Sequence, residues 1–303
     1  MDLTHDSAGP GPHGAPAADA GMTPDRRKEA LGAILRRTGK VQVRDIEAIA
    51  KHQRANNLRF GEAAVSLGLV KPADVVVALA HQFSYPLLDV GDQRVDPEVA
   101  VAFSPSGSTV EAVRILRNQI LVRWLDKAGD NRSLSILSAE NGTGRTFIAA
   151  NLAAAYAQLG RRVLLVDAHV QSPRVHRLFR LENDEGLTTI FRGRTGIHGI
   201  AAVDALPGLF VLPSGPRPPS ANDLLSREAM GHLLMALSRS FDLVIVDTPA
   251  DNSGGAARMI ASRAGTSLLL VRANRTSRTA VVKLADQLQQ LGASVVGVAL
   301  NHA

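Results

Sequence analysis

The feature that most constrains the fold is a regular alternation of short apolar runs with helix-like stretches from residue 134 onward. The runs are rich in β-branched residues, which is typical of strands buried on both faces of a parallel sheet. Segments with helical patterning separate them, such as 146–158 and 277–290. The alternation predicts an α/β domain with a doubly wound, mainly parallel sheet, whose ligands bind at the carboxyl ends of the strands. The expected strands read LSILSA, RVLLVDA, GLFVLPSG, FDLVIVDTP, TSLLLVRA and SVVGVALN.

A glycine-rich turn follows the first of these strands and opens directly into a helix. It reads Ser138-Ala-Glu-Asn-Gly-Thr-Gly-Arg-Thr146. Such a turn lets backbone N–H groups close around phosphate oxygens, and the helix dipole adds positive potential. The simpler alternative is a turn that only joins strand to helix. The residues expected to hold a nucleotide are Asn141, Gly142, Thr143, Gly144, Arg145, Thr146 and Phe147.

Two further strands end in an aspartate, Asp167 and Asp247. Carboxylates at this edge of a sheet, beside a phosphate loop, hold Mg²⁺ and its water, and the Thr146 hydroxyl stands where it would also ligate the ion. A single strand-end aspartate is more often a cap or turn residue, but two in this order favour a P-loop NTPase that binds ATP or ADP with Mg²⁺. The candidate catalytic residues are these two aspartates and Arg145, which replaces the usual lysine and keeps its charge.

Over residues 27–301 the sequence resembles the bacterial tyrosine kinases of the chain-length-determinant type, and most closely the exopolysaccharide kinases of the EpsG type. The family's three nucleotide motifs match residues 138–146, 167–171 and 247–250. The resemblance implies a Wzz-like membrane polysaccharide copolymerase as partner, a place at the inner face of the membrane, and a contact of Asn301 with adenine. The family's oligomerisation motif E-x-x-R-x-x-R, which implies a homo-oligomer, is matched by Glu111, Arg114 and Arg117.

Three departures from the family concern phosphate transfer. Its second motif has a second aspartate and an arginine, where this chain has His169 and Gln171. A neutral imidazole supplies no carboxylate charge, and glutamine supplies no cation for the phosphate. The family's autophosphorylated tyrosine cluster follows the last strand, whereas the tyrosines here are Tyr85 and Tyr156. Arginine at the lysine position occurs in the EpsG type, so the expectation of weak or lost phosphotransfer rests on the three departures.

The residues before the α/β domain contain an internal repeat. Residues 31–53 (LGAILRRTGKVQVRDIEAIAKHQ) recur as 60–82 (FGEAAVSLGLVKPADVVVALAHQ) at an offset of 29 residues. Each copy predicts two helices joined at a glycine C-cap. We therefore expect four regions: a disordered tail (1–24), a small helical domain (25–91), a linker (92–108) and a P-loop kinase-like domain (109–303).

The repeated module resembles the N-terminal domain of type II secretion and pilus-assembly ATPases. Some of these bind cyclic-di-GMP through paired RLGxxL-type repeats. The second copy has Arg59 before Phe60, but the first has Ala30 at the equivalent place and lacks the arginine. Docking of a partner protein is therefore the favoured interpretation of the module, and cyclic-di-GMP binding is the alternative.

Composition narrows the function classes further. The formal net charge is +6 and the pI 10.1, but the arginines are scattered, so we expect a solvated basic surface and no nucleic-acid partner. There is no cysteine, no secretory signal and no apolar stretch near the ~20 residues of a membrane helix, which predicts a cytoplasmic protein. Two alternatives stay open: a positioning ATPase of the partitioning (ParA) or division-site (MinD) type, which lacks the E-x-x-R-x-x-R helix, and a scaffold that binds no nucleotide.

Overall fold

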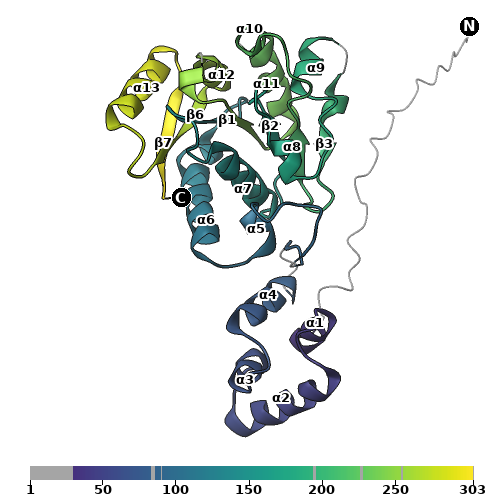
Figure 1. Cartoon of the computed structure of the whole chain (residues 1–303). Coiled ribbons are helices and arrows are strands. Elements are labelled where there is room, and N and C mark those ends of the chain that lie inside the picture. The colour runs from purple at the N-terminus through teal and green to yellow at the C-terminus, as the bar shows by residue number, and fades with distance from the viewer. Residues whose placement is uncertain are drawn as a thin grey trace, which may run out of the picture.

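The chain consists of a small group of helices followed by an α/β domain (Figure 1). This arrangement confirms the predicted α/β fold, in which a helical N-terminal region precedes a domain with a mainly parallel sheet. The expected tail over 1–24 and Tyr85 lie outside the described residues. The computed structural model describes residues 30–82, 86–89, 91–193, 196–225, 228–253 and 255–302.

A seven-stranded sheet in the order β3-β4-β2-β5-β1-β6-β7 forms the centre of the α/β domain. All neighbouring strands run parallel except β3 and β4. The carboxyl ends of β1, β2 and β5 therefore meet at one edge, which is where a parallel sheet binds ligands. The strands are β1 (Ser133–Leu137), β2 (Val163–Asp167), β3 (Ala201–Ala202), β4 (Leu209–Leu212), β5 (Leu243–Asp247), β6 (Thr266–Arg272) and β7 (Ser294–Asn301).

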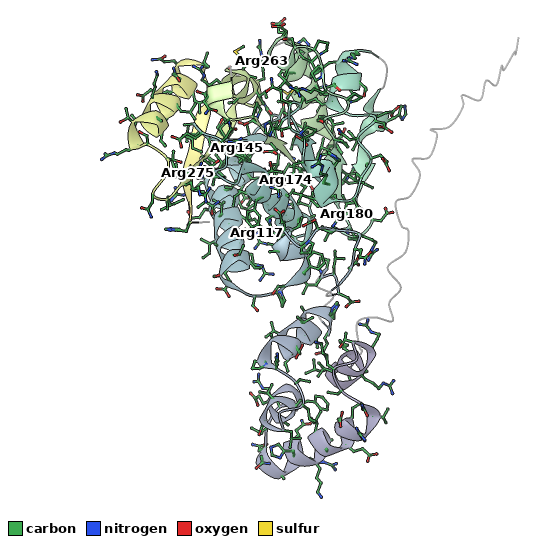
Figure 2. All side chains as sticks on the ribbon, viewed as in Figure 1. Arg117, Arg145, Arg174, Arg180, Arg263 and Arg275 are labelled. Atoms are coloured by element: carbon green, nitrogen blue, oxygen red, sulfur yellow. The ribbon has the colours of Figure 1, made fainter. Side chains whose placement is uncertain are left out.

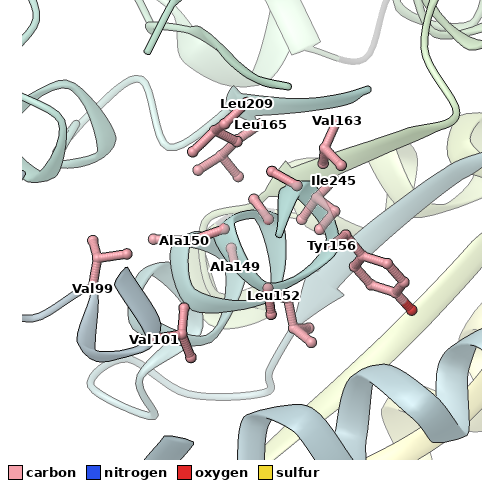
Figure 3. Close-up of a cluster of buried hydrophobic side chains, with 14 of the residues drawn as sticks. Val99, Val101, Ala149, Ala150, Leu152, Tyr156, Val163, Leu165, Leu209 and Ile245 are labelled. Atoms are coloured by element: carbon pink, nitrogen blue, oxygen red, sulfur yellow. The ribbon is translucent and has the colours of Figure 1, made fainter. Parts of the chain in front are cut away.

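Helices cover both faces of the sheet because its central strands are apolar on both sides. Every residue of β1, β2 and β5 is buried. On one face α7 packs over Leu165 and Ile245, in the cluster that Figure 3 shows, and α6 packs on α7 and β7. On the other face α11 and α12 pack over Val166 and Val246. The helices of this domain are α5 (Ala100–Phe103), α6 (Ser108–Arg123), α7 (Arg145–Ala157), α8 (Val175–Leu178), α9 (Leu187–Phe191), α10 (Ala221–Leu225), α11 (Glu228–Ser240), α12 (Ala256–Ala264) and α13 (Arg278–Gln290), with short 3₁₀ turns η2 (Leu125–Lys127), η3 (Ile197–Gly199) and η4 (Asp251–Ser253).

The segment that we expected to be a linker lies against α7. Val99 and Val101 are fully buried in the same cluster as the sheet residues. Asn151 of α7 accepts the N–H of Val101 (3.2 Å) and donates to the carbonyl of Glu98 (2.9 Å). One buried amide thus satisfies backbone groups of a segment that has little regular structure of its own. The proline-containing, small-residue composition of this stretch did not lead us to expect that it packs into the core.

The N-terminal helices form a separate module with its own buried cluster, which includes Ile34, Leu35 and Ile49. Helix α1 packs on α4, and α2 packs on α3. Gly39 (φ +70°) and Gly68 (φ +68°) take the left-handed conformation at equivalent places in the two copies, as predicted from the repeat. No helix in the described residues is long and apolar enough to cross a membrane. The module helices are α1 (Leu31–Arg37), α2 (Val43–Asn56), α3 (Phe60–Ser66) and α4 (Pro72–Gln82).

Candidate nucleotide site

The glycine-rich turn joins the end of β1 to the start of α7 and has the backbone conformation of a phosphate loop. Gly142 (φ +73°) and Gly144 (φ +93°) are both left-handed, a conformation that glycine adopts without steric cost. Helix α7 begins directly after Gly144, so the free N–H groups of its first turn adjoin the loop. Asn141 is exposed on the loop, and Phe147 is half-buried in the first turn of the helix. All the loop residues predicted from the sequence therefore lie on one turn and the helix start.

Arg145 is buried under this loop. Its guanidinium donates to the carbonyl of Thr248 (3.0 Å), to the carbonyl of Glu140 (2.8 Å) and to the hydroxyl of Ser138. Burial lowers the pKa of Arg145, and the neighbouring charge of Asp247 works against that shift. The guanidinium stays charged at neutral pH because arginine is the most strongly basic side chain. The cation therefore lies inside the site, between the phosphate loop and the end of β5.

Asp167 and Asp247 lie side by side because β2 and β5 are parallel neighbours and these two residues are register partners. Both are fully buried. Asp167 accepts hydrogen bonds of 3.0–3.1 Å from backbone N–H groups of the loop that follows β2, and so organises that loop. Asp247 accepts the hydroxyl of Thr146 through Oδ2 at 2.6 Å, whereas its Oδ1 is buried without a hydrogen-bond partner.

Burial raises the pKa of both carboxyl groups, and the charge of Asp167 raises the pKa of Asp247 further. The hydrogen bonds to the two carboxylates oppose the shift but do not cancel it. Across the described ranges no ion pair is formed by either aspartate. Two adjacent buried carboxylates repel each other, so this pair favours protons or a metal cation between them.

The oxygens present here fit a hard divalent cation. Mg²⁺ prefers carboxylate and hydroxyl oxygens and usually keeps water or phosphate oxygens as well. The oxygens that could bind such a cation are Thr146 Oγ1 and the carboxylate of Asp247, with the carboxylate of Asp167 beside them. In the described part of the chain no cluster of three or more acidic or histidine side chains could hold a metal alone. A cation at this place would complete its coordination with oxygens from outside the protein, such as water or phosphate.

The two substituted positions of the second motif lie in different surroundings. His169 is half-buried, and burial together with the charge of Arg145 lowers its pKa, so it is neutral at physiological pH. Gln171 is exposed. A cation that the sequence analysis missed, Arg174, ends the same loop and forms an ion pair with Glu98. Figure 2 labels Arg145 and Arg174 in the α/β domain, away from the helical module. The position of Arg174 on the loop that follows Asp167 was the one sequence signal that could have identified it.

The outer side of the phosphate loop is held by the ends of β6 and β7. Asn301 Nδ2 donates to the carbonyl of Thr143 at 2.9 Å, and Arg272 Nη1 donates to the carbonyl of Gly142 at 3.2 Å. The resemblance assigned Asn301 to adenine, but in the structure its amide contacts the loop itself. Arg272 was not predicted, although its place at a strand end could have drawn attention to it.

The predicted oligomerisation residues lie on α6, outside this site. Glu111 is exposed. Arg114 donates to the carbonyl of Pro105, and the buried Arg117 donates to the carbonyl of Ala155 at 3.2 Å, in the last turn of α7. Both arginines therefore make contacts within the chain, and the homo-oligomer stays a prediction.

Comparison with known proteins covers the α/β domain. The family model described as cellulose biosynthesis protein BcsQ matches residues 132–295. Tyrosine-protein kinase YwqD of Bacillus subtilis is 31% identical over 208 residues, which are 69% of this chain and 87% of YwqD. Tyrosine-protein kinase Etk of Escherichia coli K12 is 33% identical over 198 residues. These are 65% of this chain, which thus spans 27% of the length of Etk.

Solved structures agree with these matches. The kinase domain of E. coli Etk superposes with a TM-score of 0.64 at 32% identity, over 70% of this chain and 82% of that domain. The cell division ATPase MinD of Pyrococcus furiosus superposes with a TM-score of 0.50 at 25% identity, over 56% of this chain and 72% of MinD. The match to YwqD extends over 87% of that kinase. The chain belongs to the bacterial tyrosine-kinase family.

Proposed function

We propose that this chain binds Mg-ATP at residues 138–146 and works as a tyrosine-kinase-like protein of exopolysaccharide synthesis. In this proposal a Wzz-like membrane copolymerase is its partner and keeps it in the cytoplasm at the inner face of the membrane. One observation carries the nucleotide part: Asp247 Oδ1 is buried and unbonded beside the Thr146 hydroxyl. A buried oxygen without a partner costs stability, and a cation bound with phosphate would offset that cost.

Each residue of the site has a role in this proposal. The backbone N–H groups of 142–146 bind the β- and γ-phosphates, and Arg145 adds positive charge beneath them. Thr146, Asp247 and Asp167 would hold Mg²⁺ at the ends of β2 and β5. The bound ion supplies neutralisation of the charge on the transferring phosphate. The chain itself binds and orients the nucleotide.

We further infer that transfer of the γ-phosphate to tyrosine is weak. The neutral His169 and the exposed Gln171 leave two charged positions of the second motif unfilled. Catalysis of this reaction depends on positioned charge, and the loss of one such group costs a factor of about 10²–10³ in rate. Tyr156 is a poor acceptor because its hydroxyl is buried and donates to the carbonyl of Arg117 at 2.9 Å.

Calorimetric titration of Mg-ATP into the full chain tests the nucleotide site. We expect micromolar affinity, lost in Thr146→Ala and in Asp247→Asn. Asp242→Asn is the matched control, because Asp242 precedes the opposite end of β5 and its carboxylate accepts the N–H of Arg162 (2.8 Å). Absence of binding at millimolar ATP in a folded protein would overturn the proposal and leave the nucleotide-free scaffold.

A positioning ATPase is the alternative function, and the fold shared with MinD supports it. The two functions differ in their products. Phosphorylation of a tyrosine peptide, or of a copolymerase segment, would favour the kinase. ATP-dependent dimerisation without phosphotyrosine would favour the positioning ATPase, and an oligomer lost in Arg114→Ala/Arg117→Ala would support the predicted assembly helix.

For the helical module we propose docking of a partner protein, with cyclic-di-GMP as the alternative ligand. Arg59 immediately precedes α3, where Glu62 accepts its backbone N–H at 2.8 Å. The first copy offers Ala30 at the equivalent place, so only one of the two repeats has a cation there. Heat of cyclic-di-GMP binding that is lost in Arg59→Ala would favour the dinucleotide.

A further inference from the structure

Side chains at two neighbouring strand ends donate hydrogen bonds to two successive carbonyl groups of the phosphate loop. Arg272, the last residue of β6, pairs in register with Asn301, the last residue of β7. Arg272 Nη1 donates to the carbonyl of Gly142 (3.2 Å), and Asn301 Nδ2 donates to the carbonyl of Thr143 (2.9 Å). These contacts join residues that are 130 and 158 positions apart in the sequence. The loop is thus anchored by the ends of the two strands at one edge of the same sheet.

The direction of these two carbonyls fixes the direction of the amides that follow them. In a planar trans peptide the C=O of one residue and the N–H of the next point to opposite sides. Holding the carbonyls of Gly142 and Thr143 outward therefore turns the N–H groups of Thr143 and Gly144 to the other side of the loop. Amides that converge in this way form the anion-binding concavity of a phosphate loop.

The contact between β7 and the loop is close. A Cβ added at Gly144 would lie 2.6 Å from Asn301 Nδ2. Glycine is thus needed at 144 both for its φ of +93° and for the approach of this side chain. The strand end and the loop therefore fit each other as a unit.

We propose that Asn301 and Arg272 are positioning residues that orient the phosphate loop, and that their effect on affinity depends on the phosphates and not on the base. This inference rests on the proposed function, since it assumes that the loop binds phosphate. It gives Asn301 a different role from the adenine contact that the family resemblance implies. It also adds Arg272, whose side chain reaches the loop from the neighbouring strand.

The test titrates Mg-ATP, Mg-GTP and magnesium tripolyphosphate into the full chain and its variants. Asn301→Leu keeps the approximate size of the side chain and removes the donor without adding charge, and Arg272→Gln removes the charge and shortens the reach. Arg275→Ala is the matched control. Arg275 is exposed on the connection between β6 and α13, so its replacement removes one positive charge without removing a contact with the loop. We expect each loop variant to weaken all three ligands by the same factor, about fivefold to tenfold for one hydrogen bond. Arg275→Ala should stay within about twofold of the wild type for a screened surface charge.

A result confined to the nucleobase would overturn the proposal. If Asn301→Leu weakens ATP binding but leaves tripolyphosphate binding unchanged, Asn301 contacts adenine and does not position the loop. Equal affinity of wild type and both loop variants for all three ligands would also overturn it.

A second measurement separates this inference from the proposed function. Amide hydrogen exchange of residues 142–146 in the nucleotide-free protein reports the order of the loop whether or not ATP binds. We expect severalfold faster exchange in Asn301→Leu and Arg272→Gln than in the wild type and Arg275→Ala. Unchanged exchange would overturn the positioning role. A wild type that binds no ligand but shows this pattern would refute only the proposed nucleotide function.

Discussion

At position 247 a carboxylate is buried beside a second one, and this arrangement predicts a specific pH dependence. The pKa of Asp247 is raised in the folded protein, while an unfolded chain keeps the ordinary aspartate pKa of about 4. The folded state therefore holds the proton more tightly. This tighter proton binding by Asp247 stabilises the folded protein fully below the ordinary aspartate pKa. The stabilisation is lost as the pH rises through the pKa that Asp247 has in the folded protein.

We therefore expect the metal-free protein to lose stability relative to Asp247→Asn between about pH 4 and neutral pH. The difference should reach on the order of 2 kcal/mol in the free energy of urea unfolding. Mg-ATP should reverse the order of the two proteins, because only the wild type binds it. If the difference in unfolding free energy between the two proteins stays constant across this pH range, repulsion between the two buried carboxylates does not destabilise the folded protein.

Restoring the two charges of the second motif should increase phosphotransfer. We expect His169→Asp/Gln171→Arg to release or transfer the γ-phosphate about 10²–10³ times faster than the wild type in a single-turnover assay. The same two exchanges at His52 and Gln53 of α2 are the control for net charge and should leave the rate unchanged. Equal rates in the wild type and the restored variant would show that phosphotransfer is not impaired at these positions.

The sequence located those site residues whose place follows from a local pattern. Thr146 follows the glycine turn, and Asp167 and Asp247 end apolar strands, so strand order alone brings them together. It did not locate Arg272 or Arg174, because each acts through a partner that the chain reaches only after folding. No spacing rule connects such pairs.

At the scale of secondary-structure elements, Asn151 joins α7 to the segment before it. Replacing it with alanine leaves the N–H of Val101 and the carbonyl of Glu98 without their partner in the core. Each buried unsatisfied group costs about 1–3 kcal/mol, so Asn151→Ala should lower the unfolding free energy by about 2–4 kcal/mol in urea. Gln289→Ala, an exposed amide on α13, should change it by less than about 0.5 kcal/mol. Similar values for the two variants would mean that the segment is not held through Asn151.

The strands and long helices were predictable because their apolar residues recur with the period of the element. The segment over 92–108 was not, because its burial depends on Asn151 and on the two ion pairs Arg174–Glu98 and Arg180–Asp96. These are tertiary contacts that leave no periodic signal. A lone asparagine in an alanine-rich helix was the only local hint.

At the scale of the whole molecule, the separate apolar cluster of the helical module predicts two unfolding transitions. The helical module buries Ile34, Leu35 and Ile49 among its own side chains, apart from the clusters around the sheet. Differential scanning calorimetry of the full chain should resolve a smaller and a larger transition. Ile49→Ala should shift only the smaller one, at a cost of about 2–5 kcal/mol. A single cooperative transition shifted as a whole would show that the module and the sheet unfold together.

The paired aspartates at the ends of β2 and β5 also show how stability and binding are balanced in this chain. Two like charges are buried next to each other, which is locally unfavourable, whereas the other contacts of the domain support the fold. A neutral side chain at 247 would remove this repulsion, so stability alone does not favour an aspartate there. Both carboxylates are present, whereas His169 and Gln171 stand at the other charged positions of the family's second motif. Under the proposed function the bound cation offsets the repulsion, and the lower stability of the empty site is the consequence of keeping it ready to bind.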